Sequence, residues 1–91
     1  MQDYSEKVLL IKNKIGKIFR ELRKKEGCIS LNKLALEYDI DKGSLSKVER
    51  GIYDCRISTA LKICEANGIK FSDFAKLLEN ELGEKFKFID D

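Results

Sequence analysis

The segment SLNKLALEYDIDKGSLSKVERG, residues 30–51, contains two short amphipathic patterns that are separated by three residues. The first begins at Ser30, a good N-cap, and its apolar positions share one helical face: Leu31, Leu34, Ala35 and Tyr38. The second begins after Asp41, another N-cap type, and turns Leu45 and Val48 inward. Because three residues are too few to let the helices lie parallel, the two must cross. The segment therefore predicts a helix-turn-helix.

The composition favours one small helical domain around this motif. The 91 residues are enough for a single core, with 43% apolar and 37% charged residues, and the chain has no proline. No apolar run approaches the ~20 residues of a membrane span, and no stretch resembles a signal peptide. We therefore expect a soluble, cytoplasmic protein.

The sequence offers little for catalysis or metal binding. Histidine is absent, and the three cysteines are odd in number and form no C-x-x-C pair: Cys28, Cys55 and Cys64. Scattered thiols make a poor zinc site or disulfide scaffold, so we expect reduced cysteines in a helical core, with no metal and no cofactor. Without a histidine or a Gly-rich phosphate loop, little remains for general acid–base chemistry, and an enzyme is not expected.

Two helices are expected outside the motif on its C-terminal side. One spans about residues 57–67, with three inward positions: Ala60, Leu61 and Cys64. The next is capped by Ser72, ends near Gly83 and carries an apolar stripe of Phe74, Leu77, Leu78 and Leu82. The tail after Gly83 fits either a helix or a strand.

A long amphipathic helix is expected on the N-terminal side. It starts at the capping-box spacing of Asp3 and runs to about Glu26, where Gly27 stops it. The predicted fold class is therefore all-α, with a five-helix domain over residues 1–83 and a short C-terminal extension over residues 84–91.

Charge is distributed unevenly along the chain. Residues 1–56 carry 13 Lys and Arg against 9 Asp and Glu, whereas residues 57–91 carry 5 against 7. The basic half contains the predicted helix-turn-helix. This asymmetry suits one face that meets phosphates and another that meets protein.

Short motifs in a consistent order resemble the Cro and phage-repressor family, the XRE-type helix-turn-helix regulators. The resemblance covers about residues 15–78, which is most of the chain. It is carried by Ile15-Gly16, Leu22-Arg23, Leu34-Ala35, Ser44, Val48-Glu49-Arg50-Gly51, Lys62-Ile63-Cys64-Glu65-Ala66 and Gly68-Ile69. The turn residue of the family is often glycine and here is Asp39, a type that tolerates the left-handed conformation.

The resemblance implies a lambda-repressor-like domain, usually dimeric, that places its third helix in the major groove of double-stranded DNA. Carried over by position, the base-facing residues are Lys42, Gly43, Ser46 and Lys47. Phosphate-contact positions of the family match Ser44 and the residues that open the second helix. The family commonly has a phosphate-binding glutamine there, and this chain has Leu31, so we expect the adjacent Asn32 or Lys33 to take its place. We expect Arg50, Tyr53 and Arg56 to contact the phosphates of the DNA backbone as well. Tyr53 can equally cover the protein core.

Glu49 is an acidic residue on a surface that is expected to meet phosphate. The resemblance pairs it with a basic residue of the first helix, which is Arg23 or its neighbour Lys24. Such an ion pair has a structural role: it would tie the third helix to the first.

The C-terminal end is unusually apolar for a small domain that already has four helices to bury. We expect it to form a dimer interface through Phe71, Phe74, Leu78, Leu82, Phe86, Phe88 and Ile89. The alternative is that the tail folds back on its own core.

Two functional hypotheses remain at this point. The first is a sequence-specific transcriptional regulator, a dimeric repressor or autoregulator. The second is a protein-interaction module such as an antitoxin, in which the acidic tail binds a protein partner and DNA binding is secondary.

Overall fold

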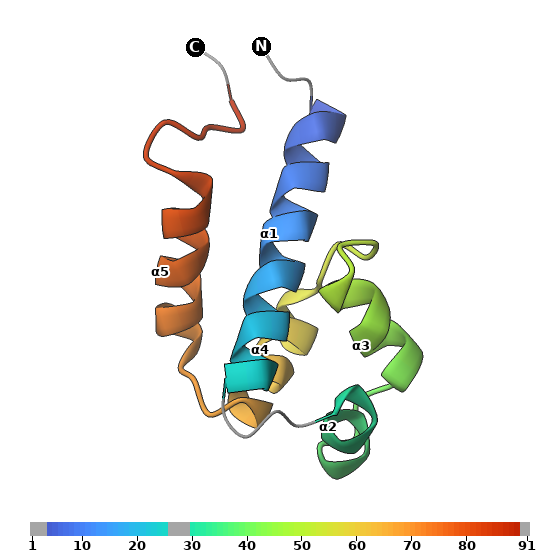
Figure 1. Cartoon of the computed structure of the whole chain (residues 1–91). Coiled ribbons are helices and arrows are strands. Elements are labelled where there is room, and N and C mark those ends of the chain that lie inside the picture. Colours follow the sequence, from blue (N-terminus) through green and yellow to red (C-terminus); the bar gives the residue numbers. More distant parts are fainter. Residues whose placement is uncertain (1–3, 26–29, 90–91) are drawn as a thin grey trace.

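The computed structural model describes residues 4–25 and 30–89, and it is helical (Figure 1). The five helices are α1 (Tyr4–Lys25), α2 (Leu31–Glu37), α3 (Lys42–Glu49), α4 (Ile57–Ala66) and α5 (Phe71–Leu82). These described residues contain no strand, which confirms the all-α prediction. The expected cap Asp3 and the expected stop Gly27 lie outside the described residues.

The helices form an elongated molecule of 44 × 23 × 20 Å. Helices α1 and α5 run side by side in opposite directions, so that the start of α1 and the end of α5 lie at the same end of the molecule (Figure 1). Helices α2 and α3 lie at the other end, on the side of α1 away from α5. No helix among the described residues is long and apolar enough to cross a membrane.

The core draws one or more side chains from every helix. Its largest fully buried members are Phe19, Leu34, Leu45, Ile63 and Cys64. Phe19 of α1 also stacks on Phe74 of α5, with ring centroids 4.6 Å apart. Leu34, Leu45 and Cys64 were expected here, and each is confirmed.

Some expected faces are wrong. Leu61 is 44% exposed and Tyr38 is 42% exposed, whereas Ile63 takes the core position of α4. Helix α5 begins at Phe71 with Lys70 as its N-cap residue, so Ser72 is not the cap. The apolar periodicity predicts each helix correctly. It does not determine which residues at the edge of the apolar face are buried, and the prediction is off by about one residue there.

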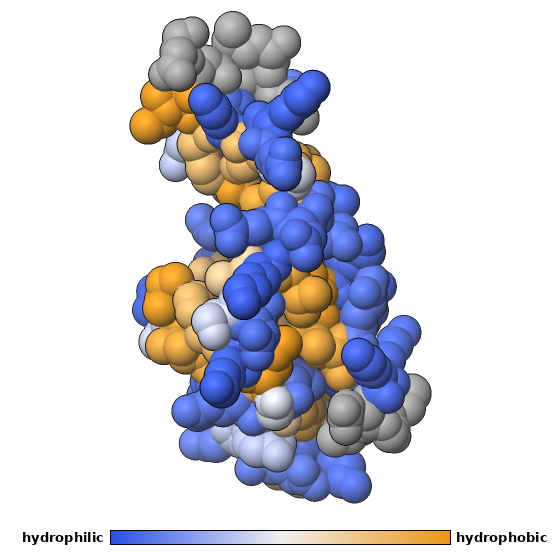
Figure 2. All heavy atoms as spheres, turned by 90° about the vertical axis from the view of Figure 1, so that its left-hand side faces the viewer, coloured by the Kyte–Doolittle hydropathy of each residue, from blue (hydrophilic) through white to orange (hydrophobic). Residues whose placement is uncertain are grey.

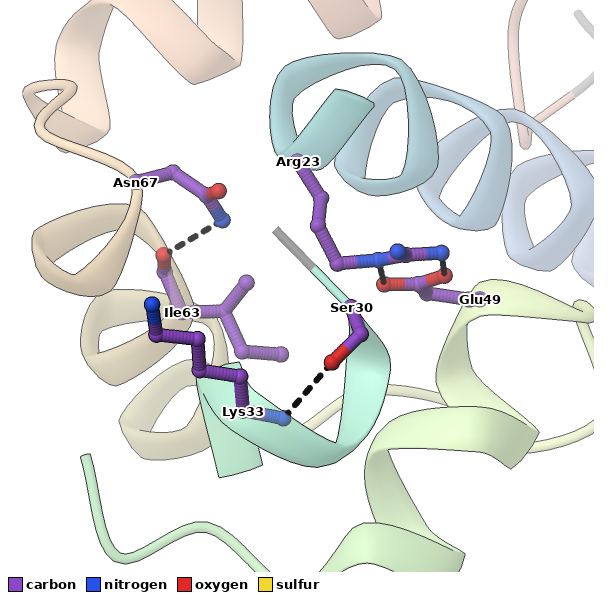
Figure 3. Close-up of polar contacts among 6 residues, drawn as sticks. All are labelled: Arg23, Ser30, Lys33, Glu49, Ile63 and Asn67. Carbon is purple, nitrogen blue, oxygen red and sulfur yellow. Dashed lines mark hydrogen bonds and ion pairs between the residues drawn. The ribbon is translucent and has the colours of Figure 1, made fainter. Parts of the chain in front are cut away.

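The two helices of the motif begin as predicted. The Ser30 hydroxyl accepts a hydrogen bond from the Lys33 backbone N–H at 3.1 Å (Figure 3). The Asp41 carboxylate accepts one from the Ser44 backbone N–H at 2.9 Å and another from the Ser44 hydroxyl at 3.0 Å. These two bonds hold the pKa of Asp41 below its ordinary value, because they stabilise the ionised carboxylate.

Helix α1 and helix α3 meet at Gly16. A Cβ atom at this position would lie 2.5 Å from the Glu49 carbonyl oxygen and 2.6 Å from that of Val48. No side chain fits at such distances, so the absence of a side chain lets α1 approach the end of α3 directly. Gly16 therefore determines how closely the two helices pack.

An ion pair closes the same joint. Arg23 Nε donates to Glu49 Oε2 at 2.8 Å, and a second guanidinium nitrogen donates to Oε1 at 2.9 Å (Figure 3). The side chains are only 11% and 5% exposed. The partner of Glu49 is thus Arg23, whereas Lys24 is exposed. A two-point contact of planar groups orients α3 as well as attaching it.

We predict that Glu49→Ala destabilises the fold by on the order of 3 kcal/mol, because it removes the carboxylate that accepts two hydrogen bonds from the Arg23 guanidinium at a site only 11% exposed. The melting temperature should fall by roughly 10 °C or more in thermal unfolding of a domain this small. Glu79→Ala, which removes an exposed carboxylate of α5, is the control and should change little. Replacing both Arg23 and Glu49 by methionine should cost less than the sum of the single changes; strict additivity would contradict the coupling.

The lowered pKa of Asp41 predicts a pH-dependent contribution to stability. Ionised Asp41 stabilises the fold above its unfolded pKa of about 3.9, and this contribution is lost as pH falls through the lower folded value. Asp41→Asn keeps a capping oxygen and removes the charge. The stability difference between wild type and Asp41→Asn in urea unfolding should therefore shrink on acidification below about pH 4. A difference that stays constant from pH 7 to pH 3 would contradict it.

Candidate nucleic-acid interface

The outer side of α3 is polar and reaches solvent. Lys42 and Gly43 are exposed, while Ser46 and Lys47 are half-buried. The opposite side of the helix is inside the core, where Leu45 and Val48 are 0% and 3% exposed. All four residues expected to face bases therefore lie on the accessible part of this helix, which occupies an edge of the molecule (Figure 1).

Lys47 and Tyr53 contact one another. The Lys47 ammonium donates a hydrogen bond to the Tyr53 hydroxyl at 3.1 Å and lies 5.0 Å from the centre of its ring. Tyr53 itself is 43% exposed, so it does not close over the core. The contact places a cation and an aromatic hydroxyl together at the C-terminal half of α3.

A hollow of about 430 Å³ lies between α3 and the start of α4. Its walls include three of the residues expected at phosphates, Ser44, Tyr53 and Arg56, together with Val48, Asp54, Cys55 and Thr59. Arg56 is also the N-cap residue of α4, and its side chain makes no capping bond. The first backbone N–H groups of α4 can therefore donate hydrogen bonds to an anion or to water. The negative charge of Asp54, in the wall of the same hollow, disfavours an anion there.

The thiol in this hollow is not poised for chemistry. Burial, followed by the nearby Asp54 and Cys64, raises the pKa of Cys55 to about 11. The group is therefore a neutral thiol at pH 7, and thiols rather than thiolates are poor nucleophiles. Cys64 is buried, as expected for a core cysteine, and Cys28 lies outside the described residues.

The remaining predicted phosphate residues lie on the surface of α2 and at the end of α3. Asn32 and Lys33 are exposed in the first turn of α2, and Arg50 is exposed at the C-cap of α3. Lys33 is also 4.0 Å from Glu37 one turn later, a contact of little energy at a solvated surface.

Lys12 of α1 is a further cation near this region. Its ammonium donates to the Ile52 carbonyl at 3.4 Å and so reaches the loop between α3 and α4. Periodicity assigns Lys12 only to the polar side of α1, and no local pattern indicates which loop that side approaches. Lys14 and Lys17 instead pair with Glu81 on α5, at 3.3 and 2.9 Å.

The residues expected at a dimer interface are split by the fold. Phe74 requires a correction: it is 3% exposed and stacks on Phe19, so it belongs to the core of its own chain. Phe71 and Leu78 are partly buried and pack against the same core. The more accessible members are Leu82 and Phe86, which are half-buried, and Phe88 and Ile89, which are exposed.

Residues 84–89 form turns and bends rather than a helix or strand, and they return towards the start of α1. Lys7, which is buried, donates to the Phe88 carbonyl at 3.1 Å, and the rings of Tyr4 and Phe88 are 5.5 Å apart. The tail therefore contacts its own chain. Apolar surface nevertheless remains on both sides of a hydrophilic strip on the face seen in Figure 2.

No three His, Cys, Asp or Glu side chains in the described part of the chain are grouped closely enough to hold a metal ion. What the described residues do offer is a polar helix side, flanked by cations and hydroxyls and adjoining a helix N-terminus. Such an arrangement suits a nucleic acid, whose phosphates bind cations and hydroxyls and whose base edges carry hydrogen-bond donors and acceptors.

Comparison with known proteins agrees with this geometry. A family model described as helix-turn-helix matches residues 19–74, more than half of the chain. The match begins at Phe19 in α1 and ends at Phe74 in α5, the two rings that stack in the core. No curated protein and no solved structure matches. The family match shows that this chain belongs to the XRE-type helix-turn-helix family of DNA-binding transcriptional regulators.

Proposed function

We propose that this protein is a sequence-specific regulator of transcription that reads the major groove of double-stranded DNA with α3. The observation that carries the proposal is the two-sidedness of α3: its apolar side is fully buried, and its polar side is left to solvent. The major groove admits one α-helix and displays a different donor and acceptor pattern for each base pair. The protein acts in the cytoplasm, within reach of DNA.

The base-facing residues have distinct roles. Lys42 and Lys47 donate to acceptors such as guanine O6 and N7, and the Ser46 hydroxyl both donates and accepts. At Gly43, an added Cβ would meet only the Asp41 carboxylate, at 3.3 Å. Since Gly43 is exposed, its bare backbone lets α3 approach the floor of the groove closely.

Phosphate contacts hold the helix in register. Ser44, Tyr53 and Arg56 around the hollow contact one strand, with the first N–H groups of α4. Asn32 and Lys33 on α2 and Arg50 at the end of α3 contact the backbone on either side of the groove. These contacts position the protein without reading sequence.

The functional unit is a homodimer, with residues 1–83 as the DNA-binding domain and residues 84–91 as part of the dimerisation element. The contact is made by the accessible apolar residues at the α5 end, namely Leu82, Phe86, Phe88 and Ile89. Two-fold symmetry would set two copies of α3 about 34 Å apart, one turn of DNA. Such a dimer represses by occupying its operator, including one that controls its own gene.

The proposal predicts that selection from random DNA yields a preferred sequence and that Lys42→Gln weakens binding to it. The loss should be about tenfold, within the 1–3 kcal/mol of a well-placed base contact, and should relax preference at one position. Lys76→Gln, an exposed lysine on α5, is the matched control and should bind as wild type does. Equal losses in both variants would contradict a base contact by Lys42.

Salt dependence tests the phosphate contacts and separates the two functional hypotheses. Arg56→Gln should reduce the slope of log K against log salt by about 0.9, because one phosphate contact is lost. A specific regulator retains a tight complex with one sequence at salt concentrations that release random DNA. An antitoxin-like interaction module would show only the salt-sensitive, non-specific component.

Sedimentation at tens of micromolar should show a dimer, and Ile89→Ser should weaken it because Ile89 is 79% exposed in the single chain. Leu36→Ser is the control, since Leu36 is 84% exposed on α2, away from α5. A monomeric wild type at this concentration would rule out the proposed dimer.

A further inference from the structure

The turn between α2 and α3 contains the one non-glycine residue with positive φ among residues 4–25 and 30–89. Asp39 has φ 52°, in the left-handed region that side chains disfavour. The Ile40 N–H just after it donates to the Ala35 carbonyl at 2.9 Å and so closes the end of α2. The turn therefore has a backbone conformation that is unfavourable for Asp39 alone and that the hydrogen bonds around it stabilise.

A lysine from another helix reaches this turn. Lys62 of α4 donates from Nζ to the Asp39 carbonyl oxygen at 2.6 Å, across 23 residues of sequence. Its neighbour Ile63 is fully buried, which fixes the position of the α4 backbone. The bond is charge-assisted, which shortens it, and it lies at the exposed surface of the domain.

Helix α3 is secured differently at its two ends. Its C-terminal end is joined to α1 by Glu49 and by the close approach at Gly16. Its N-terminal end continues directly from the turn, since α3 begins at Lys42, three residues after Asp39. The turn at Asp39 therefore leads directly into the end of α3 that carries the exposed Lys42 and Gly43.

We propose that Lys62 is a positioning residue for the recognition helix. It fixes the turn at Asp39 and, through the turn, the angle at which Lys42 and Gly43 enter the groove. This inference rests on the proposed function. Lys62 does not need to touch DNA for this role, because its ammonium is bound to the carbonyl of the turn.

The first experiment uses the free protein and needs no DNA. In Lys62→Met, amide hydrogen exchange at Ile40 should be faster by about three- to tenfold, because the turn loses one charged hydrogen bond. The three-bond coupling that reports φ at Asp39 should also shift. Lys62→Arg, which keeps a donor of similar reach, should restore both, and Lys76→Met should change neither. Unchanged Ile40 exchange in Lys62→Met would overturn the inference.

The second experiment compares the selected sequence with random DNA, at a temperature where every variant is folded. Lys62→Met should lower the ratio of specific to non-specific affinity by about three- to tenfold, with recovery in Lys62→Arg. The salt slope on random DNA should stay unchanged. A slope reduced by about 0.9 would overturn the inference, because it would mean that Lys62 contacts a phosphate itself.

The outcomes separate this inference from the function on which it rests. A wild-type protein without a preferred sequence overturns the proposed function, and the inference with it. A wild-type protein that has a preferred sequence, with an unchanged ratio in Lys62→Met, overturns the positioning role alone.

Discussion

The joint between α1 and the C-terminal end of α3 is the constraint on which the rest of the interface depends. At Gly16, the backbone of α1 comes close enough to the carbonyls of Val48 and Glu49 that no side chain fits. Two parallel hydrogen bonds between Arg23 and Glu49 then fix the orientation of α3 relative to α1. A buried ion pair contributes modest net stability against an apolar replacement, but it specifies orientation. Orientation is what a helix needs in order to present one side to a partner.

Capping and turn chemistry act at the other end of the same helix. The Asp41 carboxylate accepts the otherwise unpaired backbone N–H of Ser44 at the start of α3, and the left-handed residue Asp39 sets the direction in which the chain enters the helix. Between the two ends, Leu45 and Val48 occupy the core. The helix is short, with eight residues, and would not persist alone in water. Its shape at the surface is therefore a property of the whole domain.

Much of the interface was predictable because its elements are encoded locally. Ser30 and Asp41 indicate where α2 and α3 begin, because each has a short side chain that accepts a hydrogen bond from a backbone N–H of the first turn. The apolar spacing of Leu34, Leu45 and Val48 indicates which side of each helix is buried. Pairing of Glu49 with the first helix came from the family resemblance, and the structure assigns Arg23 rather than Lys24. Local rules failed at the edge of an apolar helix face, where they placed Leu61 rather than Ile63 in the core. They also failed at Phe74, an aromatic residue that could pack either in its own core or at a dimer interface.

The sequence alone determined the helical class, the two crossing helices, the caps of α2 and α3, and the division of α3 into an apolar and a polar side, because all of these depend on neighbours within about four residues. Only the tertiary structure decided which cation meets Glu49, that Lys47 contacts Tyr53, that Lys62 reaches the turn at Asp39, and that the tail returns to Lys7. Each of these contacts, except that of Lys47 with Tyr53, joins residues more than twenty positions apart. Their partners are selected by how the helices pack in three dimensions, and a one-dimensional pattern carries no record of that packing.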